Sequence, residues 1–296
     1  MKLSKPHEIQ LKALINICFE QDSPKRKREI HQDIIRLIEA SSPDSIEIEP
    51  VDDIATNDLL LCMILVITMY GFFSITIPDN NPENIMFSAL FRTICNSIYS
   101  ILLLAENGLD YAAKTQLRIL LEQFFILISV TCDKEKRNSY IKNYEGKEAA
   151  TSWYKNFKKD KFIAMINAFL PEEVEIRKAL TEVVNGYYGE YSSFIHNDYL
   201  FVLCYSMAHI NDTDNRPNIC GQYQTRLHEI LMNCFSISIN MSYMFFHILD
   251  MQDVDMNIDT VIGSEKLNTQ NIFSELNRAI RYLSSIIISR EELKIT

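Results

Sequence analysis

A charged pair inside an apolar stretch is the first feature of this sequence that could do chemistry. Arg118 and Glu122 stand four residues apart between Leu117 and Phe125, so on a helix they share one face. Since the residues around them are nearly all apolar, that face is expected to be buried, and a buried charge needs a partner. The spacing therefore predicts an ion pair between Arg118 and Glu122.

A second polar pair, Arg92 and Asn96, has the same spacing in the preceding apolar segment. Asn107 and Gly108 separate the two segments, and glycine tolerates the left-handed conformation that ends many helices. The segments are therefore expected to form an antiparallel hairpin in which all four polar side chains meet. Such a cluster is either a structural network that fixes helix register, which is favoured, or a polar binding pocket.

The other candidate for chemistry is a tyrosine-rich segment that runs to a histidine. With helical spacing, Tyr188, Ser192 and His196 share one face. Tyr191 lies beside them, and Asn197 follows the histidine. A histidine exchanges protons near neutral pH, and tyrosines stack on bases or other rings. A single helical histidine is more often a hydrogen-bonded core residue, and that interpretation is favoured over a catalytic or binding role.

Residues 133–161 carry nine Lys and Arg side chains against five Asp and Glu. Five aromatic residues interleave with them: Tyr140, Tyr144, Trp153, Tyr154 and Phe157. A basic, aromatic surface suits single-stranded nucleic acid. A solvated helical face with a few aromatic rings docked inward is the commoner arrangement and is favoured here.

Composition predicts the fold class that must position these residues. Only 7 glycines and 8 prolines occur among 296 residues, which is too few for the many turns of a β-rich protein. The chain is therefore expected to be all-α, a multi-helix bundle with an N-terminal helical hairpin. The hairpin spans residues 1–45, an acidic segment with two prolines follows at 41–53, and the main bundle covers 54–290.

Turn residues and periodicity predict the main helices of this bundle. These fall at about 54–76, 82–107, 110–131, 222–251 and 268–290. Gly186 and Gly189 are expected to interrupt a helix that begins at Pro171. In the hairpin, the helix that begins at Ser23 has a basic first turn, the unfavourable sign for a helix amino end.

Charge and motif content exclude several functions. The net charge of −10 opposes binding to nucleic-acid phosphate unless the basic residues gather on one face. Seven cysteines without a close pair suit reduced thiols in the cytoplasm, not disulfides or a zinc site. The sequence contains no phosphate-binding loop, dinucleotide fingerprint or metalloprotease motif, so neither a cofactor nor a metal is expected.

Residues 59–77 form an uncharged run that is long enough to cross a membrane. Its flanks, Asp58 and Asp79, are acidic, and no cluster of Lys or Arg lies nearby to set an orientation. A buried core helix is favoured over a membrane span, and a cytoplasmic location over a membrane one.

The stretch from about residue 85 to 198 resembles a family of uncharacterised bacterial helical proteins. Its members carry an Arg-x-x-x-Glu element after a glycine-terminated helix, then a Tyr-x-x-x-Ser-x-x-x-His-like segment. Arg118 to Glu122 and Tyr188 to His196 stand at these elements. The resemblance implies a helical fold. It implies no activity, because none is assigned to the family.

More remotely, the arrangement is similar to the HEPN superfamily, helical bundles that include RNA-cleaving toxins and antiviral effectors. Those nucleases place an arginine about one helical turn before the histidine, to stabilise phosphate. The nearest arginine upstream of His196 is Arg177, which is too distant along a helix. Arg118 or Arg92 would have to replace it from a neighbouring helix.

These observations give two main hypotheses. The first is a non-enzymatic helical sensor or interaction protein, in bacterial phage defence or a toxin–antitoxin pair. It would self-associate and bind a protein partner from the same operon. The alternative is a HEPN-like RNA-acting effector, a ribonuclease that uses His196 with Arg118 or Arg92, and with Glu122 beside them. A membrane-anchored effector is a third reading that depends on residues 59–77.

Overall fold

A computed structural model describes residues 2–41, 47–48, 50–78, 81–142, 146–170, 175–195, 226–250 and 267–295. Over these residues the chain is all-α, as predicted. Two two-residue strands, β1 (Lys2–Leu3) and β2 (Glu47–Ile48), pair in parallel. The structure divides into two compact units: residues 1–78 with 262–296, and residues 79–261.

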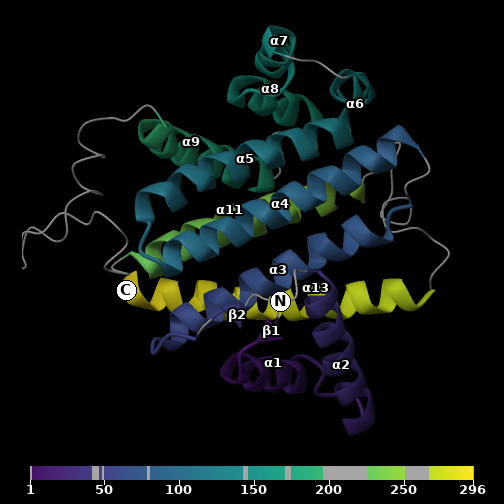
Figure 1. The fold of residues 1–296 in the computed structure, drawn as a ribbon, viewed down its shortest axis with the longest axis vertical. Helices are drawn as coiled ribbons and strands as arrows, with labels where there is room; N and C mark the ends of the chain where they lie inside the picture. Colours follow the sequence, from purple (N-terminus) through teal and green to yellow (C-terminus); the bar gives the residue numbers. More distant parts are fainter. Residues whose placement is uncertain are drawn as a thin grey trace, which may run out of the picture. The chain divides into compact units, whose positions relative to one another are not determined.

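The first unit contains α1 (Lys5–Cys18), α2 (Pro24–Ala40), α3 (Ile54–Thr76) and α13 (Leu267–Ile295). The N-terminal hairpin of α1 and α2 packs with α3 and α13 in this unit (Figure 1). The buried carboxylate of Asp58 on α3 accepts hydrogen bonds from Gln10 of α1 and Arg290 of α13. Side chains of α1, α3 and α13 thus meet at one buried carboxylate.

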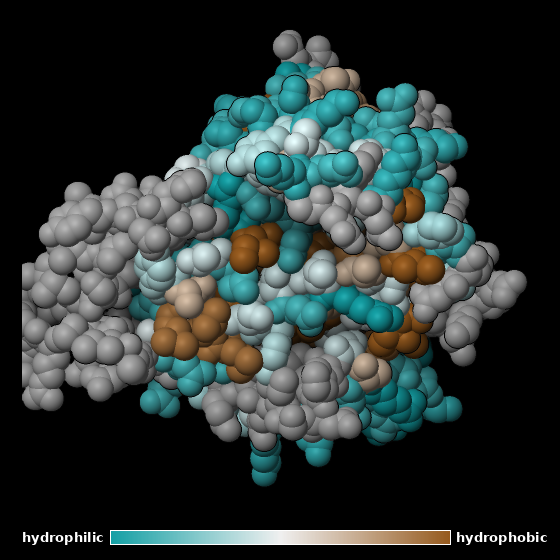
Figure 2. Space-filling view, turned by 45° about the horizontal axis from the view of Figure 1, so that its top comes forward, coloured by the Kyte–Doolittle hydropathy of each residue, from teal (hydrophilic) through white to brown (hydrophobic). Residues whose placement is uncertain are grey.

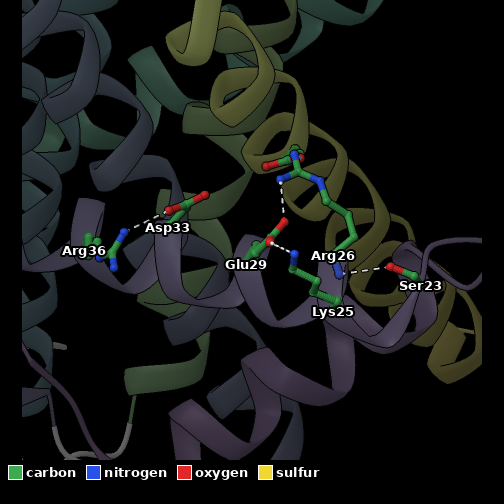
Figure 3. Close-up of polar contacts among 7 residues, drawn as sticks. Ser23, Lys25, Arg26, Glu29, Asp33 and Arg36 are labelled. Carbon is green, nitrogen blue, oxygen red and sulfur yellow. Dashed lines mark hydrogen bonds and ion pairs between the residues drawn. The ribbon is translucent and has the colours of Figure 1, made fainter.

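The basic first turn of α2 is compensated by nearby acidic side chains and a cap (Figure 3). The hydroxyl of Ser23 accepts a hydrogen bond from the Arg26 backbone N–H at 3.2 Å, which satisfies one free donor of the helix end. Glu29 lies 3.9 Å from Lys25 and 3.5 Å from Arg26. Arg26 also pairs with Glu275 of α13, so its charge helps to join two helices.

Helix α3 is buried on all sides over most of its length. Every residue from Leu59 to Ser74 is buried, as expected of a helix with no polar face. By length and composition, α3 and two helices of the second unit, α4 (Pro82–Glu106) and α5 (Asp110–Cys132), could cross a membrane. The apolar windows of these three helices are 89%, 56% and 61% buried inside the structure.

Gly71 lies at a close approach between α3 and the end of α2. A Cβ atom at this position would lie 2.7 Å from Cβ and 2.9 Å from Oγ of Ser41. We therefore expect Gly71→Ala to destabilise the protein by about 1–3 kcal/mol, because overpacking outweighs the better helix propensity of alanine. Chemical denaturation followed by circular dichroism measures the change.

Gly186 provides the matched control, because a Cβ there meets nothing within 4 Å. Gly186→Ala is expected to be neutral or stabilising by up to about 1 kcal/mol. Adding Ser41→Gly to Gly71→Ala should recover most of the lost stability. A double variant as unstable as Gly71→Ala alone would contradict the packing explanation.

The second unit is built on the predicted hairpin of α4 and α5, which is confirmed (Figure 1). Gly108 has φ 66°, the left-handed conformation that its position required. The N–H of Leu109 donates to Leu104 O at 2.8 Å, and the N–H of Gly108 donates to Ala105 O at 3.0 Å. This is the Schellman arrangement, and it turns the chain directly into α5.

Two further long helices cover the hairpin. Helix α11 (Leu227–Leu249) packs against both α4 and α5, and α9 (Glu175–Ile195) packs against α5 and α11. Between α5 and α9 in the sequence come three short helices, α6 (Lys134–Ile141), α7 (Gly146–Asn156) and α8 (Lys159–Phe169). They gather beside α5 at the upper end of the unit in Figure 1.

The expected interruption of α9 at its glycines is wrong. The helix runs without a break through Gly186 and Gly189, neither of which has a neighbour within 4 Å of its Cβ position. Leu180, Val184 and Tyr191 are buried along the same helix. Tertiary packing of this face outweighs the roughly 1 kcal/mol that each interior glycine costs a helix.

Candidate functional site

Helix α5 carries a line of ionisable residues on an otherwise apolar surface. Asp110, Lys114, Arg118 and Glu122 follow one another at intervals of four, so they lie along one face of the helix. The first three are buried in the structure. This face is directed at α9 and α11, which supply the groups that neutralise it.

Arg118 is the most highly coordinated residue of the line. Its Nε donates to Glu122 Oε1 at 2.8 Å, and its Nη2 lies 2.7 Å from the same oxygen. Its Nη1 donates to the carbonyl oxygen of Tyr188 at 3.0 Å and to Ser192 Oγ at 2.6 Å. The predicted pairing of Arg118 with Glu122 is thus confirmed, and the same guanidinium joins α5 to α9.

Ser192 completes the network with both of its hydrogen-bonding functions. Its hydroxyl donates to Tyr188 O at 2.6 Å, one helical turn earlier, and its oxygen accepts from Arg118. Tyr188 O therefore accepts from both Arg118 and Ser192. Because the hydroxyl is used in both directions, Ser192 serves as a fixed hydrogen-bonding bridge.

The Tyr188 ring continues this contact into the apolar core. The Arg118 Cζ atom lies 3.1 Å from the centroid of the ring, a cation–π contact. Phe125 stacks on Tyr188 at 6.1 Å between centroids and on Phe162 of α8 at 4.4 Å. Burial raises the pKa of Tyr188, so the phenol stays protonated at neutral pH.

Lys114 forms a second network one turn earlier on α5. Its side chain is only 1% exposed, and Nζ lies 3.1 Å from Glu190 of α9 and 2.5 Å from Glu229 of α11. Two carboxylates around one buried ammonium join three helices. Sequence analysis missed this residue, although its place four residues before Arg118 was the signal that could have found it.

Asp110 stands at the start of the line, in the first turn of α5. Burial raises the pKa of its carboxyl group to about 6, with the negative charge of Glu229 adding to the shift and the positive charges of Arg226 and Lys114 opposing it. Among the residues that the structure describes, its Oδ1 atom has no hydrogen-bond partner. The group therefore changes charge near pH 6, well above the usual range for aspartate.

Residues 84–214 match the model of a family of unknown function, DUF5677. The match spans α4 to α9, the helices that carry Arg118, Glu122, Tyr188 and Ser192. No curated protein and no solved structure matches the chain. The matched family has no assigned activity.

Two of the predicted polar residues lie elsewhere. Arg92 and Asn96 are exposed, whereas Phe91 and Ile94 of the same helix are buried, with Phe91 against Phe245 of α11 at 5.9 Å. The expectation that all four polar groups meet between α4 and α5 is therefore wrong. The apolar face of α4 occupies the contact, and Arg92 and Asn96 point outward.

Three predicted residues remain: Tyr191, which lies in the core, and His196 and Asn197. Tyr191 is fully buried and stacks on Tyr187 at 5.5 Å, and burial strongly raises its pKa. Tyr191 therefore lies in the core of the second unit. His196 and Asn197 lie outside the described residues. Within those residues, no group of three or more His, Cys, Asp or Glu is positioned to hold a metal ion.

Proposed function

We propose that this chain is a non-enzymatic helical sensor or interaction protein, acting in bacterial phage defence or in a toxin–antitoxin pair. The observation that carries the proposal is the hydrogen bonding and burial of Arg118. All three nitrogens of its guanidinium have acceptors within the protein, and the residue is 6% exposed. The sequence element most suggestive of chemistry is thus used to join two helices.

The charge balance around Arg118 also disfavours a phosphate-binding role. An incoming phosphate would have to displace Ser192 and would face the carboxylate of Glu122, which holds Arg118 at 2.7 Å. Repulsion between this carboxylate and the negative charge of the phosphate opposes an anionic ligand. The Arg118 network instead suits a structural role, in which it holds α5 and α9 together beneath surfaces that contact partners.

Self-association is part of the proposal. Ile85 and Tyr140 are 52% and 37% exposed, and they border an apolar groove of about 350 Å³ between α4 and α6. Exposed apolar surface of this kind favours contact with a second copy or with a protein partner from the same operon. Light scattering on the purified chain tests this, and a monomer at every concentration would contradict self-association.

A HEPN-like RNA-acting effector is the second candidate. The observation that favours it is the 2.6 Å hydrogen bond from Arg118 to Ser192. Ser192 precedes His196 by four residues in the sequence, so on a continuous helix the two would share a face. In such an enzyme His196 would act as general base and Arg118 would release Ser192 to bind phosphate. That step requires the network described above to open.

Incubation of the purified chain with total RNA in metal-free buffer separates the two candidates. We expect no cleavage by the natural sequence. Cleavage that disappears in His196→Ala but persists in His31→Ala, a histidine of the first unit, would overturn the non-enzymatic proposal. Equal cleavage by all variants would identify a contaminating nuclease, which the same preparation after a further purification step would lack.

A further inference from the structure

The end of the second unit opposite Gly108 contains an open groove of about 610 Å³. It lies where the carboxyl end of α5 meets α6, α7 and α8, and four lysines line it: Lys134, Lys136, Lys155 and Lys161. These residues come from three helices, so the fold gathers charges that are spread over the sequence. Figure 2 brings this end of the unit forward, and the surface there is largely hydrophilic.

The four lysines keep their charge available. In the part of the chain that the structure describes, none of their ammonium groups forms an ion pair, whereas Lys158 nearby pairs with Asp160 at 3.3 Å. Since the whole chain carries a charge of −10, a local gathering of unpaired lysines runs against its general composition.

The acidic residues at the groove offset only part of this charge. Asp133 caps α6, because its Oδ1 accepts the backbone N–H groups of Glu135 at 2.9 Å and Lys136 at 3.2 Å. Glu135 remains as a second negative charge, so four cations face two anions. Burial lowers the pKa of Lys136; the charge of Asp133 opposes this shift, and the charge of Lys161 adds to it. Because both lysines line the groove, an anion bound there would reduce the repulsion between them.

The part of the groove that α8 lines is apolar. Helix α8 contributes Ala164, Met165, Ala168 and Phe169, which present a thioether and an aromatic ring beside the lysines. Met side chains adapt to flat ligands, and aromatic rings stack on bases. The volume falls in the range of about 300–1,000 Å³ that is typical of small-ligand sites.

We propose that this groove binds a nucleotide, with its phosphates against the four lysines and its base over Met165 and Phe169. The lysines supply point charges that suit phosphate, and the apolar side chains of α8 favour an organic phosphate over a simple inorganic anion. The nucleotide is either free or one unit of a single-stranded RNA. Because the groove shares no residue with the Arg118 network, this proposal stands or falls independently of the proposed function.

The test is a binding titration with the full chain and two probes. ATP is titrated by calorimetry, and a labelled oligoadenylate of about ten nucleotides by fluorescence anisotropy. We expect one or both probes to bind, and Lys136→Gln with Lys161→Gln to weaken that binding by about tenfold or more. Binding of ATP alone would identify a free nucleotide, and binding of the oligonucleotide alone would identify RNA.

A matched double variant controls for net charge. Lys142→Gln with Lys158→Gln removes the same charge from the same segment outside the groove, and it should change affinity by less than about twofold. Equal weakening by both double variants would mean diffuse electrostatic attraction and would overturn the proposal. So would the absence of binding by either probe, provided that circular dichroism finds the natural chain folded.

Discussion

Glu122→Leu is expected to lower the free energy of unfolding by about 3–5 kcal/mol, because it leaves the buried guanidinium of Arg118 without its counter-charge. Tyr188 O and Ser192 Oγ remain as neutral acceptors, which satisfy hydrogen bonds but do not balance a charge. Arg118→Met should cost less, since Glu122 is 25% exposed and water can hydrate its carboxylate. Urea denaturation followed by circular dichroism measures both.

The double variant Arg118→Met with Glu122→Leu completes a thermodynamic cycle. Removing both charges is expected to restore much of the loss, so that the two changes are strongly non-additive. The surface pair Lys25 and Glu29 has the same four-residue spacing but is 83% and 44% exposed, and Glu29→Leu should cost less than about 1 kcal/mol. Additivity within about 0.5 kcal/mol at Arg118 and Glu122 would contradict the network as described.

Asp110→Asn is expected to stabilise the protein above pH 6, by up to about 3 kcal/mol. Burial raises the pKa of the folded carboxyl to about 6 from 3.8, so the folded state holds its proton more tightly than the unfolded state. Below about pH 4 both states are protonated and the residue costs nothing. As the pH rises towards 6, the unfolded state ionises first, and the free energy of unfolding falls.

The pH dependence distinguishes this explanation from a simple packing effect. The difference in unfolding free energy between Asp110→Asn and the natural chain should grow between about pH 4 and 6 and then stay constant. Titrating groups that do not interact with Asp110 contribute equally to both proteins and cancel in the difference. A difference that is independent of pH over this range would mean that the carboxyl does not titrate with a raised pKa.

The features of the fold that the sequence predicted depend on short-range chemistry. The hairpin of α4 and α5 follows from apolar periodicity and from a glycine at a left-handed position, and both are properties of neighbouring residues. The pairing of Arg118 with Glu122 is likewise set by the four-residue repeat of one helix. Both features can be predicted without knowing which helices pack together.

The features that it did not predict depend on the tertiary packing. Arg92 has the same spacing from Asn96 as Arg118 has from Glu122, yet it is exposed, because α4 turns its other face to α11. Lys114 finds its carboxylates 76 and 115 residues later in the sequence. Composition singled out residues 133–161 as basic and aromatic. Which of their lysines line the groove depends on how three short helices pack, and the sequence does not reveal that.

The order of elements along the chain has a consequence for biosynthesis. The second unit is continuous in sequence, whereas the first combines residues 1–78 with 262–296. During translation, α3 therefore leaves the ribosome long before α13, the helix whose Phe273 ring packs against its Phe73 at 5.2 Å. Until then α3, the most apolar of the helices that the structure describes, lacks a principal neighbour, and we expect nascent chains to need chaperones that shield hydrophobic segments.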